Sequence, residues 1–294
     1  MNNIKTKDPI ISNIIGYLED YFKEIVISVY GIGSYFDKAL PTDWKINDID
    51  VLVIVSSLEK IPKLEWTEVR YETRNIENYN VWLGYNTLRG LKEKEVFAHE
   101  SFANYEWSLL DLKCQENSQL LYGKDIRNHL PKISDLKYDY DDIFARCLYH
   151  LDKSLKESKS YRKSLVSERE FTKAVFKFGF FICKYFDKNY YLTSVHNIIK
   201  HVERLPIEEK IRKNMLYFMN ESNMFRRTYN FSTDFKILRK NFTFFIFSLL
   251  RNGNLHRKLE FYEIINFLEN KFNGLPFLTK YIKTAKKIYN SSKN

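Results

Sequence analysis

Two acidic residues at the start of an apolar strand constrain this chain more than any other feature. Asp48 precedes the run Ile49 to Val55, and Asp50 is the second residue of that run. Successive side chains of a strand point to opposite faces, so the two carboxylates share one face. Neighbouring carboxylates repel each other unless a cation lies between them, and Mg²⁺ prefers oxygen ligands. The spacing therefore predicts part of a metal site.

A Gly-Ser pair, Gly33 and Ser34, lies between this strand and an earlier apolar run, residues 24–30. Glycine lets the backbone approach a ligand closely, and the backbone N–H groups of such a turn can bind phosphate. The pattern predicts a phosphate-binding turn beside a metal-binding acid pair. The alternative is a plain turn followed by two surface acids.

Gly33-Ser34 followed by Asp48-Ile49-Asp50-Val51 resembles the motif of the DNA polymerase β-like nucleotidyltransferase superfamily. Residues 118–126, Ser-Gln-Leu-Leu-Tyr-Gly-Lys-Asp-Ile, are similar to a segment that closes the catalytic domain of many members. The resemblance, which covers about residues 22–130, implies transfer of a nucleoside monophosphate from an NTP to an acceptor, with release of pyrophosphate. It implies that Asp48 and Asp50 are catalytic ligands of Mg²⁺ or Mn²⁺, and that Gly33 and Ser34 bind the nucleotide phosphates.

The family generally uses a third acid on a neighbouring strand, and the apolar run 81–86 contains none. Glu68 and Glu72 share one face of the predicted strand 67–73 and are the first candidates for this catalytic role. Asp111, within a helical pattern, is another. A chain without a functional third acid is the remaining alternative, and it would be a weak enzyme or a binding relic.

The charge is distributed unevenly along the chain. Residues 1–136 contain 16 Lys and Arg against 21 Asp and Glu, a balance of −5, whereas residues 137–294 contain 31 against 16, a balance of +15. A basic half favours an anionic partner such as RNA. Lys173 shares one face of a predicted helix with Lys177 and Lys184 and is a candidate nucleotide-binding residue, although such a face is also typical of a solvated surface.

The hydrophobic pattern predicts an α+β chain of two domains. The resemblance implies that residues 1–133 form a nucleotidyltransferase fold, a short mixed sheet with flanking helices, and the pattern of residues 134–294 predicts a basic helical bundle. In the first domain we expect a helix over 9–23, the strands 24–30 and 49–55, a hairpin of 67–73 with 79–85, and a mostly helical stretch 88–119 closed by Gly123. The helices expected in the second domain are 139–158, 167–187, 193–204, 207–222, 232–251, 259–272 and 275–290.

The composition limits the class of protein. No stretch reaches the roughly 20 apolar residues of a membrane helix, the start lacks the apolar region of a signal peptide, and the three cysteines fit no zinc pattern. These features favour a cytoplasmic protein without a membrane partner. The resemblance implies a nucleotidyltransferase, and the basic C-terminal half favours RNA or another polyanion as its acceptor over an antibiotic or a protein. The alternative is a catalytically degenerate protein of the same fold that binds nucleotide or nucleic acid, for example in a toxin–antitoxin pair.

Overall fold

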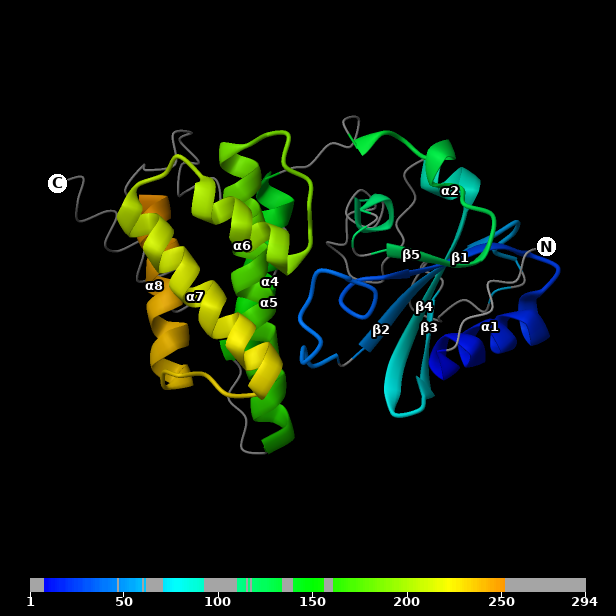
Figure 1. The fold of residues 1–294 in the computed structure, drawn as a ribbon, viewed down its shortest axis with the longest axis horizontal. Helices are drawn as coiled ribbons and strands as arrows, with labels where there is room; N and C mark the ends of the chain where they lie inside the picture. The colour runs from blue at the N-terminus through cyan, green and yellow to red at the C-terminus, as the bar shows by residue number, and fades with distance from the viewer. Residues whose placement is uncertain are drawn as a thin grey trace. The chain divides into compact units, whose positions relative to one another are not determined.

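The computed structural model describes residues 8–46, 48–59, 61, 71–92, 110–114, 116, 118–133, 140–155 and 161–251. They fall into two compact units, one comprising residues 1–138 with 189–197 and the other residues 139–188 with 198–294. The first unit holds a five-stranded mixed sheet with helices, and the described elements of the second are helices (Figure 1). The α+β class predicted from the sequence is confirmed.

The sheet has the order β3-β4-β2-β1-β5. Its strands are β1 (Val26–Ile32), β2 (Asp48–Val55), β3 (Tyr71–Ile76), β4 (Tyr79–Thr87) and β5 (Ser118–Gly123). Strands β2 and β4 pair in parallel, and the other three pairs are antiparallel. The predicted hairpin of β3 and β4 is confirmed, and its turn is only Glu77 and Asn78, whose φ values of 48° and 71° fit a two-residue hairpin loop.

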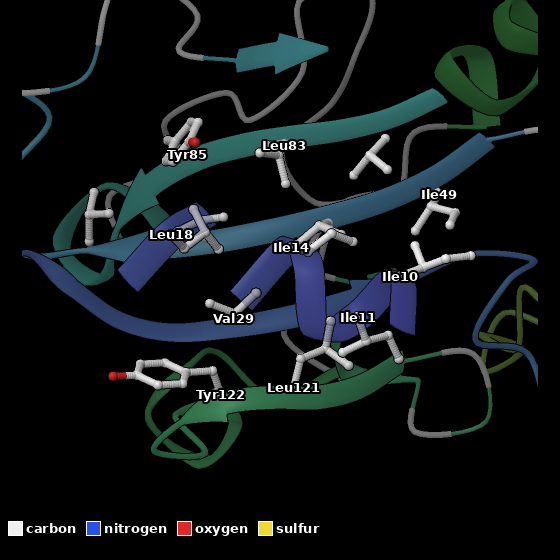
Figure 2. Packing of buried hydrophobic residues seen from close by; sticks show 14 of the residues in the cluster. Ile10, Ile11, Ile14, Leu18, Val29, Ile49, Leu83, Tyr85, Leu121 and Tyr122 are labelled. Atoms are coloured by element: carbon white, nitrogen blue, oxygen red, sulfur yellow. The ribbon is translucent and has the colours of Figure 1, made fainter. Parts of the chain in front are cut away.

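Helix α1 (Pro9–Phe22) covers one face of this sheet (Figure 2). The Asp8 carboxylate begins the helix by accepting hydrogen bonds from the backbone N–H groups of Ile10 and Ile11, at 2.9 and 3.3 Å. The buried side chains of α1 pack on the sheet; the helix contributes Ile10, Ile11, Ile14 and Leu18, and the sheet contributes Val29, Ile49, Val51, Val53, Val55, Val81, Leu83 and Tyr85. Because side chains alternate along β2, this packing assigns Asp48 and Asp50 to the opposite face.

The helical stretch predicted over 88–119 is wrong in part. Helix α2 spans only Leu88–Lys92, a further helical turn covers 110–113, and residues 93–109 lie outside the described part of the chain. Residues 118–123 form β5, so Gly123 ends an edge strand rather than a helix. The positive φ of Gly123, 79°, suits either role, which is why the glycine alone misled the prediction.

The second unit contains helices where the periodicity predicted them. Helices α4 (Tyr140–Leu155), α5 (Tyr161–Phe186), α6 (Val195–Arg204), α7 (Glu209–Thr228) and α8 (Phe235–Arg251) match the expected ranges within six residues at each end. Helix α6 begins within the segment grouped with the first unit. Phenylalanines form much of the core of the second unit; the fully buried ones include Phe171, Phe178, Phe180, Phe181, Phe225 and Phe242. The two helices expected after residue 258 lie outside the described residues.

Residues 189–197, which join α5 to α6, group with the first unit, although the predicted boundary at 133/134 placed them in the helical domain. The Cys114 thiol donates a hydrogen bond to the Tyr191 carbonyl at 3.4 Å, and the Asn197 amide donates one to the Glu116 carboxylate. Burial raises the pKa of Asp37, which has Ser194 as a neighbour. This segment therefore completes the packing of the sheet unit from within the helical half of the sequence.

Within the part of the chain that the structure describes, we find no helix with both the length and the apolar character that crossing a membrane requires.

Candidate functional site

The turn after β1 carries the Gly-Ser pair, and two glycines shape it. Gly33 adopts φ +77°, and its carbonyl accepts a hydrogen bond from the Phe36 N–H at 3.1 Å. At Gly31, a Cβ atom would lie 2.1 Å from the ring of Phe36, so the ring packs directly across the end of β1. The turn that leads through Ser34 is thus fixed by a left-handed glycine and by a buried aromatic ring.

The turn is also tied to the start of α1. The Tyr35 hydroxyl, one residue after Ser34, donates a hydrogen bond of 2.7 Å to the carboxylate of Asp8. That carboxylate caps α1 through its other oxygen. Burial, followed by the bond to Asp8, raises the pKa of Tyr35, so the hydroxyl keeps its proton and remains a donor. Ser34 itself is half-buried, and its backbone is held from both sides.

The acid pair lies beside this turn. Asp48 is half-buried, Ile49 is fully buried under α1, and Asp50 is exposed, which is the alternation expected for two acids on one face. Asp50 pairs with Ile32 across the antiparallel β1–β2 ladder. A Cβ atom built on Gly33 would lie 3.3 Å from Oδ2 of Asp50. Gly33 and Asp50, 17 positions apart in the sequence, are therefore direct neighbours on the face that α1 does not cover.

The register of β4 shows what stands on the other side of the acid pair. Asn80 is level with Asp48 and Trp82 is level with Asp50 in the parallel ladder. The position of β3 level with Trp82 is Thr73. No acid therefore lies level with Asp50 on these two described strands.

The candidates for a third acid have different positions. Glu72 pairs with Leu83, which lies in the core under α1, so its register position is not level with Asp50. Glu68 lies outside the described residues. Asp111 lies in the helical turn 110–113 and, after burial, helps to raise the pKa of Cys114 to about 12. Glu68, Glu72 and Asp111 therefore all remain candidates for the third acid, and the backbone of Glu72 lies one register position away from that level with Asp50.

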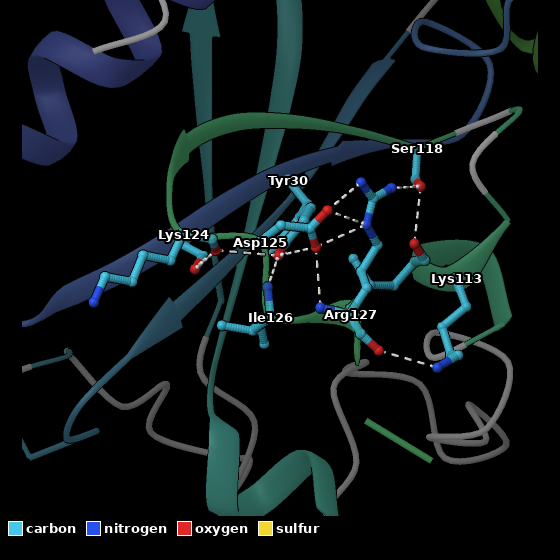
Figure 3. Close-up of polar contacts among 9 residues, drawn as sticks. Tyr30, Lys113, Ser118, Lys124, Asp125, Ile126 and Arg127 are labelled. Carbon is cyan, nitrogen blue, oxygen red and sulfur yellow. Dashed lines mark hydrogen bonds and ion pairs between the residues drawn. The ribbon is translucent and has the colours of Figure 1, made fainter. Parts of the chain in front are cut away.

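A polar network lies at the β5 edge of the sheet, where Tyr30 of β1 meets the residues that follow β5 (Figure 3). Tyr30 donates to the Asp125 carboxylate at 3.1 Å and accepts from the Ile126 N–H at 2.6 Å. The Arg127 guanidinium binds both oxygens of Asp125, at 2.6 to 3.1 Å, and reaches the Ser118 hydroxyl at 3.3 Å. Burial raises the pKa of Tyr30 to about 12. These bonds fix the segment after β5 against β1.

The resemblance described above includes residues 118–126 but assigns no role to Asp125 or Arg127. The available signal was the spacing: an acid and an arginine two residues apart, immediately after a strand-ending glycine, favour a local ion pair. Since Arg127 is only 16% exposed and both oxygens of Asp125 accept from it, the pair has a structural role at this edge.

The Asp125–Arg127 pair predicts a measurable pH dependence of stability. Hydrogen bonds from Arg127 lower the pKa of Asp125 to about 2, below its ordinary value of 3.8. A depressed pKa in the folded state contributes stability above pH 3.8 that is lost as the pH falls towards 2. We expect Asp125→Asn to destabilise the protein by about 1 kcal/mol at pH 7, since water screens a partly exposed pair, and by progressively less between pH 4 and 2. Urea unfolding of both proteins across this range measures the difference, and a difference independent of pH would contradict it.

Lys173 lies in the second unit, on α5. Its ammonium is 3.6 Å from Glu170, whose other oxygen is 2.7 Å from Nδ1 of His150 on α4. Burial raises the pKa of Glu170, but His150 and the charges of Lys173 and Lys153 outweigh it and lower the pKa to about 2. Lys184, predicted to share this face, donates instead to the carbonyl of Lys188 at the end of α5. Lys173 thus belongs to an ion cluster with neighbours from α4.

The donor set beside Gly33 suits a hard divalent cation. Mg²⁺ is usually held by one or two carboxylates, with waters and substrate phosphates completing its octahedron. Asp48 and Asp50 share a solvent-accessible face, and the described residues contain no group of three His, Cys, Asp or Glu side chains arranged to hold a metal alone. The two carboxylates fit a cation that is bound together with a phosphorylated substrate.

The comparisons with known proteins are sparse. A scan against protein-family models and a search of curated proteins found no match. Among solved structures, the chain is similar to a nucleotidyltransferase-like protein from Exiguobacterium sibiricum 255-15, with 10% sequence identity and a TM-score of 0.26 over 90% of this chain and 91% of that chain. A likeness at these values carries no argument about activity.

Proposed function

We propose that this protein is a metal-dependent nucleotidyltransferase that moves a nucleoside monophosphate from an NTP to an acceptor hydroxyl. The observation that carries the proposal is the closeness of Gly33 to the Asp50 carboxylate, since a Cβ atom on Gly33 would lie 3.3 Å from it, on the same face as Asp48. A backbone turn that can approach phosphate and an acid pair that can hold Mg²⁺ or Mn²⁺ are then side by side. Nucleotidyl transfer requires this combination because its substrate is a metal-bound triphosphate.

The proposed roles follow from these positions. Asp48 and Asp50 hold the cation, which when bound neutralises charge on the phosphates. The Gly33-Ser34 turn binds the β- and γ-phosphates through its N–H groups and the Ser34 hydroxyl. The acceptor oxygen forms a bond to the α-phosphorus as the bond to pyrophosphate breaks. The hydroxyl proton passes to the third acid, for which Glu68, Glu72 and Asp111 are the candidates, or to water.

The proposed acceptor is a polyanion, with RNA as the first candidate. The supporting observation is a group of lysines on α4 and α5, Lys153, Lys173 and Lys177, whose charges reach His150 or Glu170. These lysines add positive charge around Glu170, and burial lowers the pKa of His150. Lys153 also lies 4.1 Å from the ring of Tyr149. Cations beside an aromatic ring favour nucleic acid.

The lysine group makes a prediction about salt dependence. We expect Lys153→Ala/Lys173→Ala/Lys177→Ala to weaken binding of a single-stranded RNA, and to reduce the slope of log K against log salt by about 2, since each lost phosphate contact contributes about 0.7. Fluorescence anisotropy at several salt concentrations measures both quantities. The matched control is a triple alanine variant of Lys200, Lys210 and Lys236, which are exposed on other helices. Equal effects of the two variants would contradict a localised surface.

A second candidate function is nucleotide or nucleic-acid binding without turnover. The observation that favours it is the register of β4, which sets Asn80 and Trp82, not an acid, beside the pair. Such a protein would bind Mg²⁺ and NTP through Asp48 and Asp50 and release no pyrophosphate.

The test of the proposed function is label transfer. The protein is incubated with each α-labelled NTP, with Mg²⁺ or Mn²⁺, and with separate pools of RNA, protein and small metabolites. Label that enters one pool with the wild type, and not with Asp48→Asn/Asp50→Asn, supports the transferase and identifies the acceptor class. Metal-dependent NTP binding without label transfer in any pool supports the second candidate instead.

A further inference from the structure

One aromatic side chain lies beside the acid pair, on the face of the sheet opposite α1. Trp82 is level with Asp50 in the parallel β2–β4 ladder, and adjacent strands lie about 4.8 Å apart. Residues that are level in neighbouring strands point to the same face. Trp82 is half-buried, and Asn80 and Thr73, its neighbours on this face, are exposed. An indole ring therefore borders the proposed reaction centre.

The strand order gives the two flanks of Asp50 different roles. Strand β2 lies between β1 and β4, so Gly33, directly after β1, and Trp82, on β4, flank Asp50 on opposite sides. In an in-line transfer the attacking oxygen approaches the α-phosphorus from the side opposite to the leaving group. With the β- and γ-phosphates at Gly33, the acceptor enters from the side of Trp82.

We propose that Trp82 is the platform on which the terminal nucleotide ring of an RNA acceptor stacks, next to the hydroxyl that is modified. The inference rests on the proposed function and makes its acceptor specific. A flat aromatic ring stacks on any nucleobase, and the single-stranded end of an RNA exposes such a base. Asn80 and Thr73 add hydrogen-bonding groups but no negative charge, so this flank does not repel a phosphodiester.

The lysine group of the second unit is a separate observation, and the stacking platform does not depend on it. Lysines bind phosphates at any point along an RNA, whereas Trp82 would stack only on the base of the terminal nucleotide. Trp82 is thus a positioning residue for the acceptor, and its loss should affect acceptor binding and leave NTP binding unchanged.

The experiment uses a short RNA whose 3′-terminal base is 2-aminopurine, a base that loses fluorescence when it stacks. The RNA is added to the full-length protein with Mg²⁺ and a non-hydrolysable NTP analogue. We expect quenching with the wild type and with Trp82→Phe, and none with Trp82→Ala, whose acceptor KM should rise about tenfold or more. Tyr21→Ala removes an aromatic side chain that is 71% exposed on α1, and should behave as the wild type.

The outcomes separate this proposal from the proposed function. Quenching that survives in Trp82→Ala, or that is absent from the wild type, overturns the platform. A Trp82→Ala variant that raises the KM for NTP but not for RNA also overturns it, while label transfer by the wild type still supports the transferase. Quenching that depends on Trp82 in a protein that transfers no label supports an RNA-binding platform and rejects the transferase. Circular dichroism of each variant verifies that it is folded.

Discussion

Replacing Asp50 with asparagine is expected to lower the rate of nucleotidyl transfer on the order of a thousandfold, the usual scale for removing one charge-stabilising group from a reaction centre. Asp50 is exposed, and its carboxylate is the group that Gly33 approaches, so the amide removes a metal ligand without opening a cavity. The thermal midpoint should remain unchanged or rise slightly, because the repulsion from Asp48 is relieved. Initial rates of label transfer and thermal unfolding measure the two quantities.

The matched control for this variant is Asp20→Asn, which removes the same charge from an exposed position on α1. It should keep the full rate. Mn²⁺ binding followed by electron paramagnetic resonance gives a readout that does not need turnover, and Asp50→Asn should lose the bound signal while Asp20→Asn retains it. A variant at Asp50 that transfers label at the wild-type rate would falsify the assignment of the acid pair.

Gly123→Ala is expected to destabilise the protein by about 3 kcal/mol, the sum of a left-handed backbone and an overpacked contact. Gly123 has a φ of +79°, and a Cβ atom there would lie 2.0 Å from the carbonyl oxygen of Ile27. A backbone atom cannot rotate away as a side chain can, so β5 must separate from β1. Urea unfolding at pH 7 measures the loss.

Gly16→Ala is the matched control for the same chemical change. Gly16 lies within α1, and nothing stands within 4 Å of a Cβ atom placed there. Alanine should stabilise the helix by about 0.5–1 kcal/mol. If the two variants unfold at the same urea concentration, the edge of the sheet at Gly123 is not as tightly packed as the structure describes.

The sequence predicted the elements that local patterns determine. The period of apolar residues located α1 and the helices of the second unit, and the alternation in β2 assigned Asp48 and Asp50 to one face. The register of strands is a tertiary property, so the sequence did not reveal that Glu72 is level with Leu83 or that Trp82 is level with Asp50. Gly123 was misread because the end of a helix and the end of an edge strand use the same left-handed glycine.

The network around Asp125 was missed for a related reason. Its partners come from two separate stretches of the chain, since Tyr30 lies on β1, whereas Ser118 begins β5 and Arg127 follows that strand. Spacing reveals pairs that are close in the sequence, such as Asp125 and Arg127, but not the strand on which they will pack.

Because residues 189–197 group with the sheet unit, the two units are not separate consecutive segments of the sequence. The chain passes between its two units at 138/139, at 188/189 and again at 197/198, so no single cut separates them. A genetic exchange that kept residues 1–138 and replaced everything after them would also remove residues 189–197. The sheet unit would then lose the hydrogen bonds from Cys114 to the Tyr191 carbonyl and from the Asn197 amide to Glu116. The two halves should therefore be inherited together, and recombination between relatives should preserve residues 189–197 with the sheet unit.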